Sequence, residues 1–158
     1  MDQTIITRRR ALVAAGALGA TAALTGVRSV QAASGAGGDA VTGTWVVTVT
    51  SALNAQPPFT SIVAFAAGGS LVTADNQGPG NVSIGAWEPE GDKGFQAVFE
   101  SFAFDPSGKS FGAAVIRPRG TVDGERIHGT FSVDLVPASG PTQHGVDHGT
   151  FTGSRLEP

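Results

Sequence analysis

One carboxylate in this sequence could move a proton. Glu100 belongs to an alternating apolar segment, residues 95–104, that predicts a strand. It shares one face of that strand with Gln96 and Phe102. If this face points inward, the carboxyl of Glu100 is buried and suited to general acid–base catalysis. If it points outward, Glu100 is solvated and phenylalanines are exposed. Because the opposite face is also apolar, both orientations stay open.

The remaining polar residues form no familiar catalytic or metal-binding pattern. His144 and His148 flank Asp147, but they fall across a glycine-containing loop into a strand, so no metal site is expected. Polar residues alternate with apolar ones over residues 126–134, which predicts a polar face toward solvent. The chain has no cysteine and no G-x-S-x-G, Walker or dinucleotide-binding motif. We therefore expect neither a metal nor an organic cofactor.

Aromatic and small residues together predict an internal cavity. Nine Phe and two Trp supply apolar walls, whereas alanines and glycines within strands leave volume that larger side chains would fill. The residues expected to line this cavity are Phe65, Trp87, Ala97, Phe99, Phe102 and Phe111.

Alternation of apolar and polar residues dominates the chain after residue 40. The strand-like segments are residues 42–51, 59–66, 70–74, 81–87, 95–104, 111–117, 120–122, 125–136 and 146–156. Turn signals separate them, and Pro118 is expected to interrupt one strand. This spacing predicts an all-β fold for residues 41–158, a single antiparallel up-and-down barrel of about eight strands. Such a barrel has room inside for side chains or for one small ligand.

The two ends of this domain resemble those of a calycin barrel. Gly43-Thr44-Trp45 lies on the first strand and Arg155 on the last. In lipocalins and their relatives the Trp plugs the closed end and the Arg packs across its indole, so the resemblance implies barrel closure by Gly43, Trp45 and Arg155. It also implies that the loop Leu53 to Pro58 covers the open end. Allene-oxide-cyclase-like and dirigent-like barrels have a comparable number of strands.

A Gly-Thr-aromatic triplet recurs in the predicted strands. It occurs at residues 43–45, 129–131 and 149–151. We attribute the recurrence to shared strand composition, with an internal duplication of hairpins as the alternative.

Residues 1–32 resemble an export signal. Arg8-Arg9-Arg10 precede an uncharged stretch rich in Ala, Leu and Gly, and Val30-Gln31-Ala32 offers a cleavage site. The paired arginines and the mild hydrophobicity resemble a twin-arginine (Tat) signal, with an ordinary Sec signal as the alternative. A Tat signal implies a bacterial or archaeal protein that is exported already folded, so we expect a secreted or periplasmic location. Residues 33–40 are expected to form a flexible leader.

The charge of the remaining chain restricts its partners. Loss of residues 1–32 removes four of ten basic and one of thirteen acidic residues, which leaves six against twelve and a net charge of −6. An acidic domain lacks the basic surface that nucleic acids and anionic membranes require. The apolar run of the signal, about 17 weakly hydrophobic residues, is marginal for a membrane span, so no stable membrane anchor is expected. The expected partner is a small, mainly apolar molecule, and the oligomeric state is not indicated.

Three functional hypotheses follow. The first is an exported barrel that binds a small, mainly apolar ligand in its cavity. The alternative is a cofactor-free cyclase or isomerase that folds a flexible polyketide- or terpenoid-like substrate there, with Glu100 as its catalytic group. The third is a structural or interaction protein with a packed interior. The content of the barrel interior distinguishes them.

Overall fold

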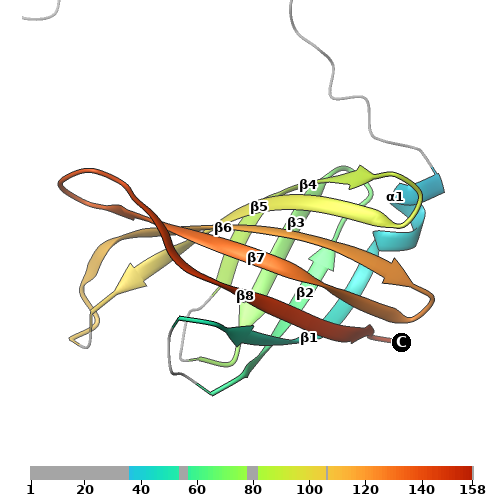
Figure 1. Ribbon diagram of the computed structural model, residues 1–158, viewed down its shortest axis with the longest axis horizontal. Coiled ribbons are helices and arrows are strands. Elements are labelled where there is room, and N and C mark those ends of the chain that lie inside the picture. The colour runs from blue at the N-terminus through green and yellow to red at the C-terminus, as the bar shows by residue number, and fades with distance from the viewer. Residues whose placement is uncertain (1–35, 54–56, 78–81, 106, 158) are drawn as a thin grey trace, which may run out of the picture.

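The chain folds into a closed β-barrel (Figure 1). The computed structural model describes residues 36–53, 57–77, 82–105 and 107–157, and the predicted signal peptide lies outside this part. The elements are α1 (Ala36–Val41), β1 (Gly43–Ser51), β2 (Phe59–Phe65), β3 (Ser70–Asp75), β4 (Val82–Glu90), β5 (Gly94–Phe104), β6 (Ser110–Asp123), β7 (Arg126–Pro137) and β8 (Gln143–Arg155). The prediction of an all-β fold is confirmed.

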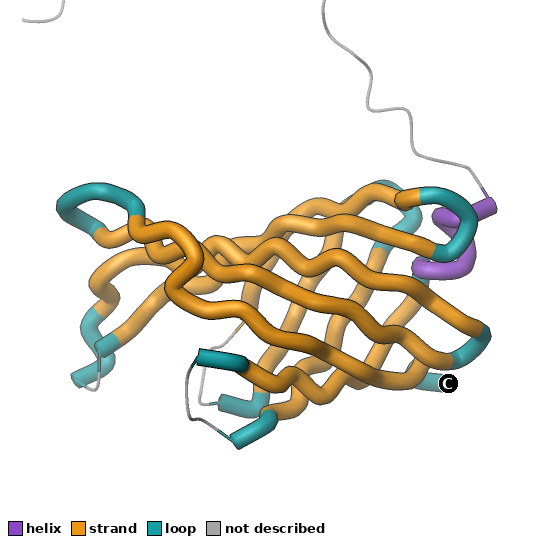
Figure 2. Tube along the Cα trace, in the orientation of Figure 1, coloured by secondary structure: helices purple, strands orange, loops and turns teal. Residues whose placement is uncertain are grey.

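The barrel has an up-and-down topology. Each strand pairs antiparallel with its neighbours in sequence, and β1 pairs with β8 to close the ring. In this closing pair Trp45 lies opposite Arg155, and Val49 lies opposite Phe151. Figure 2 shows the strands crossing the barrel obliquely, with α1 and the C-terminal residues at the same end. This is the topology that the strand spacing predicts.

Side chains alternate between the barrel interior and its outer surface. In β1, Trp45 and Val47 are buried, whereas Thr48 is exposed. In β3, Leu71 is buried and Val72 is exposed. This period of two makes the core of the barrel from every second residue.

β6 continues through Pro118, contrary to the expected interruption. Pro118 pairs with Phe131 of β7. On its other side, β6 pairs with β5 at Arg119, opposite Gln96, and again at Ile116, opposite Phe99. Pro118 lies in the gap between these two pairs. Proline has no N–H to donate, and a gap in this ladder is a place where that absence is tolerated.

Part of the segment expected to be a flexible leader is helical. Residues Ala36–Val41 form α1, which packs against β4 and β5 at one end of the barrel. Thr42 ends the helix with two hydrogen bonds to the carbonyl of Gly38, from its N–H at 3.1 Å and its hydroxyl at 2.8 Å. Val41 is completely buried, and its burial holds this segment on the barrel. No helix in the described ranges has the length and apolarity that a membrane crossing requires.

The closed end of the barrel is built around Trp45 and Arg155. Trp45 has no exposed surface, and its indole N–H donates to the carbonyl of Val41 at 2.9 Å. The guanidinium of Arg155 lies over this indole, with Cζ 4.2 Å from the ring centroid. Its Nη1 and Nη2 donate to the carbonyls of Thr42 and Ala40, each at 2.7 Å. One side chain therefore joins the last strand to the first strand and to α1.

Gly43 makes this arrangement possible. Its φ of 131° is one that L side chains rarely adopt, and a Cβ there would clash with Nη1 of Arg155. The structure thus brings Gly43, Trp45 and Arg155 together at the closed end, where the resemblance to calycins puts them.

The Gly-Thr-Phe triplets of β7 and β8 pack against each other. Gly129 lies opposite Phe151, and Phe131 lies opposite Gly149. A Cβ at Gly149 would lie 2.8 Å from two carbons of the Phe131 ring, and a Cβ at Gly129 would meet the Phe151 ring. Each glycine therefore makes room for the aromatic ring of the other triplet, which gives two of the three recurrences a packing reason beyond shared composition.

Candidate ligand-binding site

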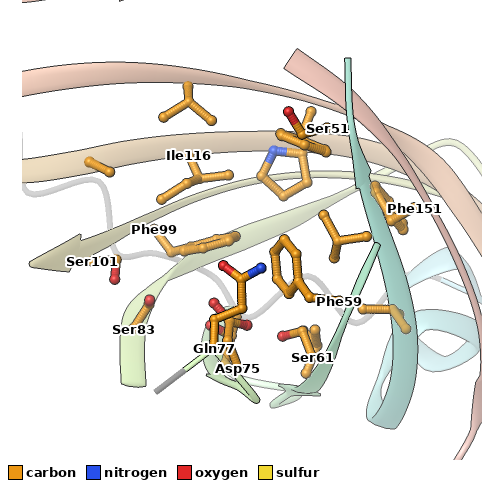
Figure 3. Close-up of a pocket in the computed structure, with 18 of the residues that line it drawn as sticks. Ser51, Phe59, Ser61, Asp75, Gln77, Ser83, Phe99, Ser101, Ile116 and Phe151 are labelled. Carbon is orange, nitrogen blue, oxygen red and sulfur yellow. The ribbon is translucent and has the colours of Figure 1, made fainter. Parts of the chain in front are cut away.

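The barrel contains a cavity of about 490 Å³. Residues from all eight strands line it, and Figure 3 shows eighteen of them. The volume falls within the roughly 300–1,000 Å³ typical of small-molecule sites. The cavity lies between the buried core and the open end, which is opposite to Trp45.

The floor and much of the wall are apolar. Phe65 and Phe95 line the floor and pack edge to face, with ring centroids 5.0 Å apart. Leu71 and Ile127 are buried beside them and line the same cavity. The wall above includes Val47, Val49, Phe99, Ile116, Phe131, Val133 and Phe151. This lining suits an apolar ligand body, because it offers no competing hydrogen bonds.

The side of the cavity formed by β2, β3 and β4 is polar. Ser61 lies opposite Asp75, and Thr73 lies opposite Ser83. In Figure 3 the labelled Ser61, Asp75, Gln77 and Ser83 lie in the lower part of the view. We call Ser61, Thr73, Asp75 and Ser83 the polar wall.

Two hydroxyls of the polar wall have no hydrogen-bond partner among the described residues. Thr73 is 2% and Ser83 1% exposed, and neither Thr73 Oγ1 nor Ser83 Oγ has a hydrogen-bond partner in the described part of the chain. A buried polar group without a partner costs about 1–3 kcal/mol. The polar wall therefore holds hydrogen-bonding capacity that the described residues do not use.

Asp75 is the titratable group of the polar wall. Burial raises the pKa of its carboxyl above the ordinary value, and a hydrogen bond from the side chain of Ser61 opposes this shift. The direction means that the desolvation of the carboxylate exceeds the stabilisation that its neighbour provides. Asp75 is thus partly buried in an environment that compensates its charge incompletely.

Asp147 lies at the open end in a different environment. It accepts hydrogen bonds from the Ser51 hydroxyl at 2.8 and 2.9 Å and from the His148 N–H at 2.7 Å. The contact with Ser51 joins β1 to β8 beside the mouth of the cavity. Pro57 also lines the cavity there. Residues 54–56 lie outside the described residues, so the lid role of this loop stays a prediction.

The structure divides the six residues expected to line the cavity. Phe65 and Phe99 line it. Trp87 and Ala97 are on the inner side but are not among the lining residues, which corrects the expectation for both. Trp87 packs edge to face on Phe65, 5.5 Å between centroids, and its indole N–H donates to the carbonyl of Ala66 at 2.9 Å. It therefore belongs to the core beneath the cavity.

The expectation for Phe102 and Phe111 is wrong. Phe102 is 71% exposed, because the alternation that turns Phe95 inward turns the even-numbered residues of β5 outward. Phe111 is also exposed. It follows a register shift at the β5–β6 hairpin, where Phe104 pairs with Ser110 and Ala103 with Gly112. Neither phenylalanine reaches the cavity.

Glu100 also lies on the outer face. It pairs in register with Ile84 of β4 and Val115 of β6, and it is exposed. The orientation in which this face points inward is therefore wrong, and Glu100 has no role in the cavity. The carboxyl that does line the cavity and is partly buried, as was expected of Glu100, is that of Asp75.

His144 helps to hold a surface hairpin. His144 Nδ1 lies 3.1 Å from a carboxylate oxygen of Asp134, which also pairs with Arg117 at 2.7 Å. The N–H of Gly145 donates to the other oxygen at 2.9 Å. This backbone bond, followed by the bond to His144, lowers the pKa of Asp134. Within the described ranges no three His, Cys, Asp or Glu residues gather as they would around a metal ion.

The polar wall was not predicted from the sequence, although a signal for it exists. Residues 71–75, LVTAD, alternate so that Leu71, Thr73 and Asp75 share one face. The expected strand ended at residue 74 because the following residues, DNQGPG, are typical of a loop. Extending the alternation by one residue would have placed Asp75 beside Thr73 on the face of a buried leucine.

Comparison with known proteins does not identify the ligand. No protein-family model, curated protein or solved structure matches the chain significantly. Its likeness to calycins is therefore a likeness of barrel architecture and closed-end geometry, and the functional argument depends on the cavity.

Proposed function

We propose that this protein is exported and binds a small, mainly apolar molecule in the barrel cavity. One observation carries the proposal, a cavity of about 490 Å³ above a tightly packed aromatic floor. Closed packing beneath the cavity and open volume above it favour a ligand site over the hypothesis of a packed interior. The export signal predicted in residues 1–32 supports a secreted or periplasmic carrier.

Binding of a neutral fluorescent probe tests the proposal. N-phenyl-1-naphthylamine is apolar and uncharged at neutral pH, and its emission rises in apolar surroundings. Burial of roughly 200–300 Å² of its surface at about 25 cal/mol/Å² corresponds to about 5–7 kcal/mol before association costs. Because association costs reduce this energy, we expect saturable binding with a Kd no tighter than roughly 5 µM.

A matched pair of variants distinguishes the cavity from the outer surface. Ala114 lines the cavity, whereas its neighbour Ala113 pairs with the exposed Phe102 on the outer face. Ala114→Phe should abolish probe binding, and Ala113→Phe, which adds the same bulk outside, should leave it unchanged. Absence of saturable binding to the wild type, or equal effects of the two variants, would contradict the proposal.

A cofactor-free cyclase or isomerase is the second candidate, with Asp75 in the role expected of Glu100. The observation that favours it is a carboxyl with a raised pKa in the cavity wall. Incubation with flexible polyketide- or terpenoid-like substrates, followed by mass spectrometry and chromatography, tests for an isomeric product. Asp75→Asn should abolish turnover while binding of a neutral substrate remains. If the wild-type protein leaves these substrates unchanged, the enzyme candidate is refuted and the carrier proposal remains.

A further inference from the structure

We propose that the ligand carries a primary amine, whose ammonium group lies against Asp75 while its apolar body fills the cavity. This inference rests on the proposed function and adds the chemistry of the polar end of the ligand. It comes from the distribution of charge and hydrogen-bonding groups around the cavity.

Every charged side chain that lines the cavity is acidic. Asp75 and Asp147 are the two carboxylates, and no Lys, Arg or His is among the described lining residues. The neighbouring residues 54–56 and 78–81 contain none of these three residue types either. An anionic ligand such as a fatty acid would meet two carboxylates and no cation, which costs binding energy on entry to an apolar site. A cation or a neutral molecule meets no such penalty.

Asp75 suits a cationic partner better than Asp147 does. Asp147 accepts a hydrogen bond from the Ser51 hydroxyl, which lies within 2.9 Å of both carboxylate oxygens, and another from the backbone N–H of His148. Asp75 has a hydrogen bond from Ser61, and burial still raises the pKa of its carboxyl. A cation beside this carboxylate would replace part of the hydration that burial removes. The group that gains most from an ammonium ligand is therefore Asp75.

The neighbouring hydroxyls favour the same chemistry. Thr73 shares the inward face of β3 with Asp75, and Ser83 lies opposite Thr73. Both line the cavity, and both hydroxyls are buried without a partner in the described structure. An ammonium has three donors and no acceptor, a carboxylate accepts, and the two hydroxyls can accept as well as donate. The polar wall thus offers complementary groups to a primary amine.

Three ligands with the same tail test this inference. Decylamine, 1-decanol and decanoic acid differ only in the polar end, and each would compete with N-phenyl-1-naphthylamine at pH 7 and 150 mM salt. We expect decylamine to bind at least 10-fold more tightly than 1-decanol and at least 100-fold more tightly than decanoic acid. Asp75→Asn should weaken decylamine to the level of the alcohol and leave 1-decanol unchanged.

Asp123→Asn is the matched control, because it removes the same charge from an exposed position at the closed end. It should leave all three affinities unchanged. Three results would overturn the inference: equal displacement of the probe by the three ligands, preference for decanoic acid, or an effect of Asp123→Asn as large as that of Asp75→Asn. In each case, binding of the probe itself would still support the proposed function. Failure of the wild type to bind the probe itself would refute the proposed function, and the inference with it.

Discussion

Substitution of Arg155 tests whether the closed end holds the barrel together. Arg155→Met keeps most of the side-chain stem and removes the guanidinium, which lies over Trp45 and donates to the carbonyls of Thr42 and Ala40. A desolvated cation–π contact contributes about 2 kcal/mol. Two hydrogen bonds from a charged donor contribute roughly 1.5–3 kcal/mol each, and they are not additive with the first contribution. We expect Arg155→Met to lower the free energy of unfolding by about 4 kcal/mol.

Urea unfolding followed by tryptophan fluorescence measures this loss. At an unfolding entropy of about 2 cal/mol/K per residue, a loss of about 4 kcal/mol corresponds to a fall in Tm of about 10–16 °C for a domain of this size. Arg155→Lys should lose about half as much, because an ammonium keeps the charge over the indole but not the planar fork. The ion pair of Arg155 with Glu125 at 2.9 Å is largely exposed on the Glu side, so Glu125→Ala should cost less than about 1 kcal/mol.

Two results would refute this reasoning. A Tm of Arg155→Met within about 2 °C of the wild type would mean that the guanidinium contacts add nothing. If Glu125→Ala loses as much stability as Arg155→Met, the stabilisation comes from the surface ion pair and not from the contacts of Arg155 with Trp45, Thr42 and Ala40.

Three other predictions concern packing, pH and export. Gly149→Ala should destabilise the barrel by about 1–3 kcal/mol in urea unfolding, because its Cβ would clash with the carbonyl oxygen of Thr50 and lie 2.8 Å from the ring of Phe131, whereas Gly68→Ala, with open space around it, should change little. Burial raises the folded-state pKa of Asp75, so its contribution to stability falls as pH rises from the ordinary value of 3.8 through the raised value. Asp75→Asn should therefore melt a few degrees higher than the wild type at pH 7 and match it near pH 3; a lower Tm of the variant at pH 7 would contradict this sign. Replacement of the three arginines at 8–10 with Lys should block secretion, as measured by immunoblotting of cell fractions, and undiminished secretion would reassign the signal to the Sec pathway.

The fold could be predicted because each strand carries its own signal. Turn residues mark the hairpins, and alternation in segments such as β1 separates inward Trp45 from outward Thr44 and Thr48. The closing pair could be anticipated because it involves chemically distinctive residues, a Trp and an Arg, at the two ends of the domain. Local chemistry determines these features, so a single sequence reveals them.

The orientation of β5 could not be predicted, for a physical reason. Both of its faces are apolar, with Phe95 and Phe99 on one and Phe102 on the other, so alternation gives no preference. The choice is made by the neighbouring strands, whose register puts Glu100 beside Ile84 and outside the barrel. The same limit applies to the polar wall, since Thr73 and Ser83 are neighbours only after β3 and β4 have paired.

The pairing of β1 with β8 also has a consequence for synthesis of the protein. Seven of the eight strand pairings join neighbours in sequence and can form while the chain is still emerging from the ribosome, but the bond from Arg155 to Thr42 spans 113 residues. Until β8 emerges, β1 presents an unpaired edge with the uncharged sequence GTWVVTVTS. Translational pausing before the last strand should therefore promote aggregation more than pausing after it, because completion of β8 covers this edge.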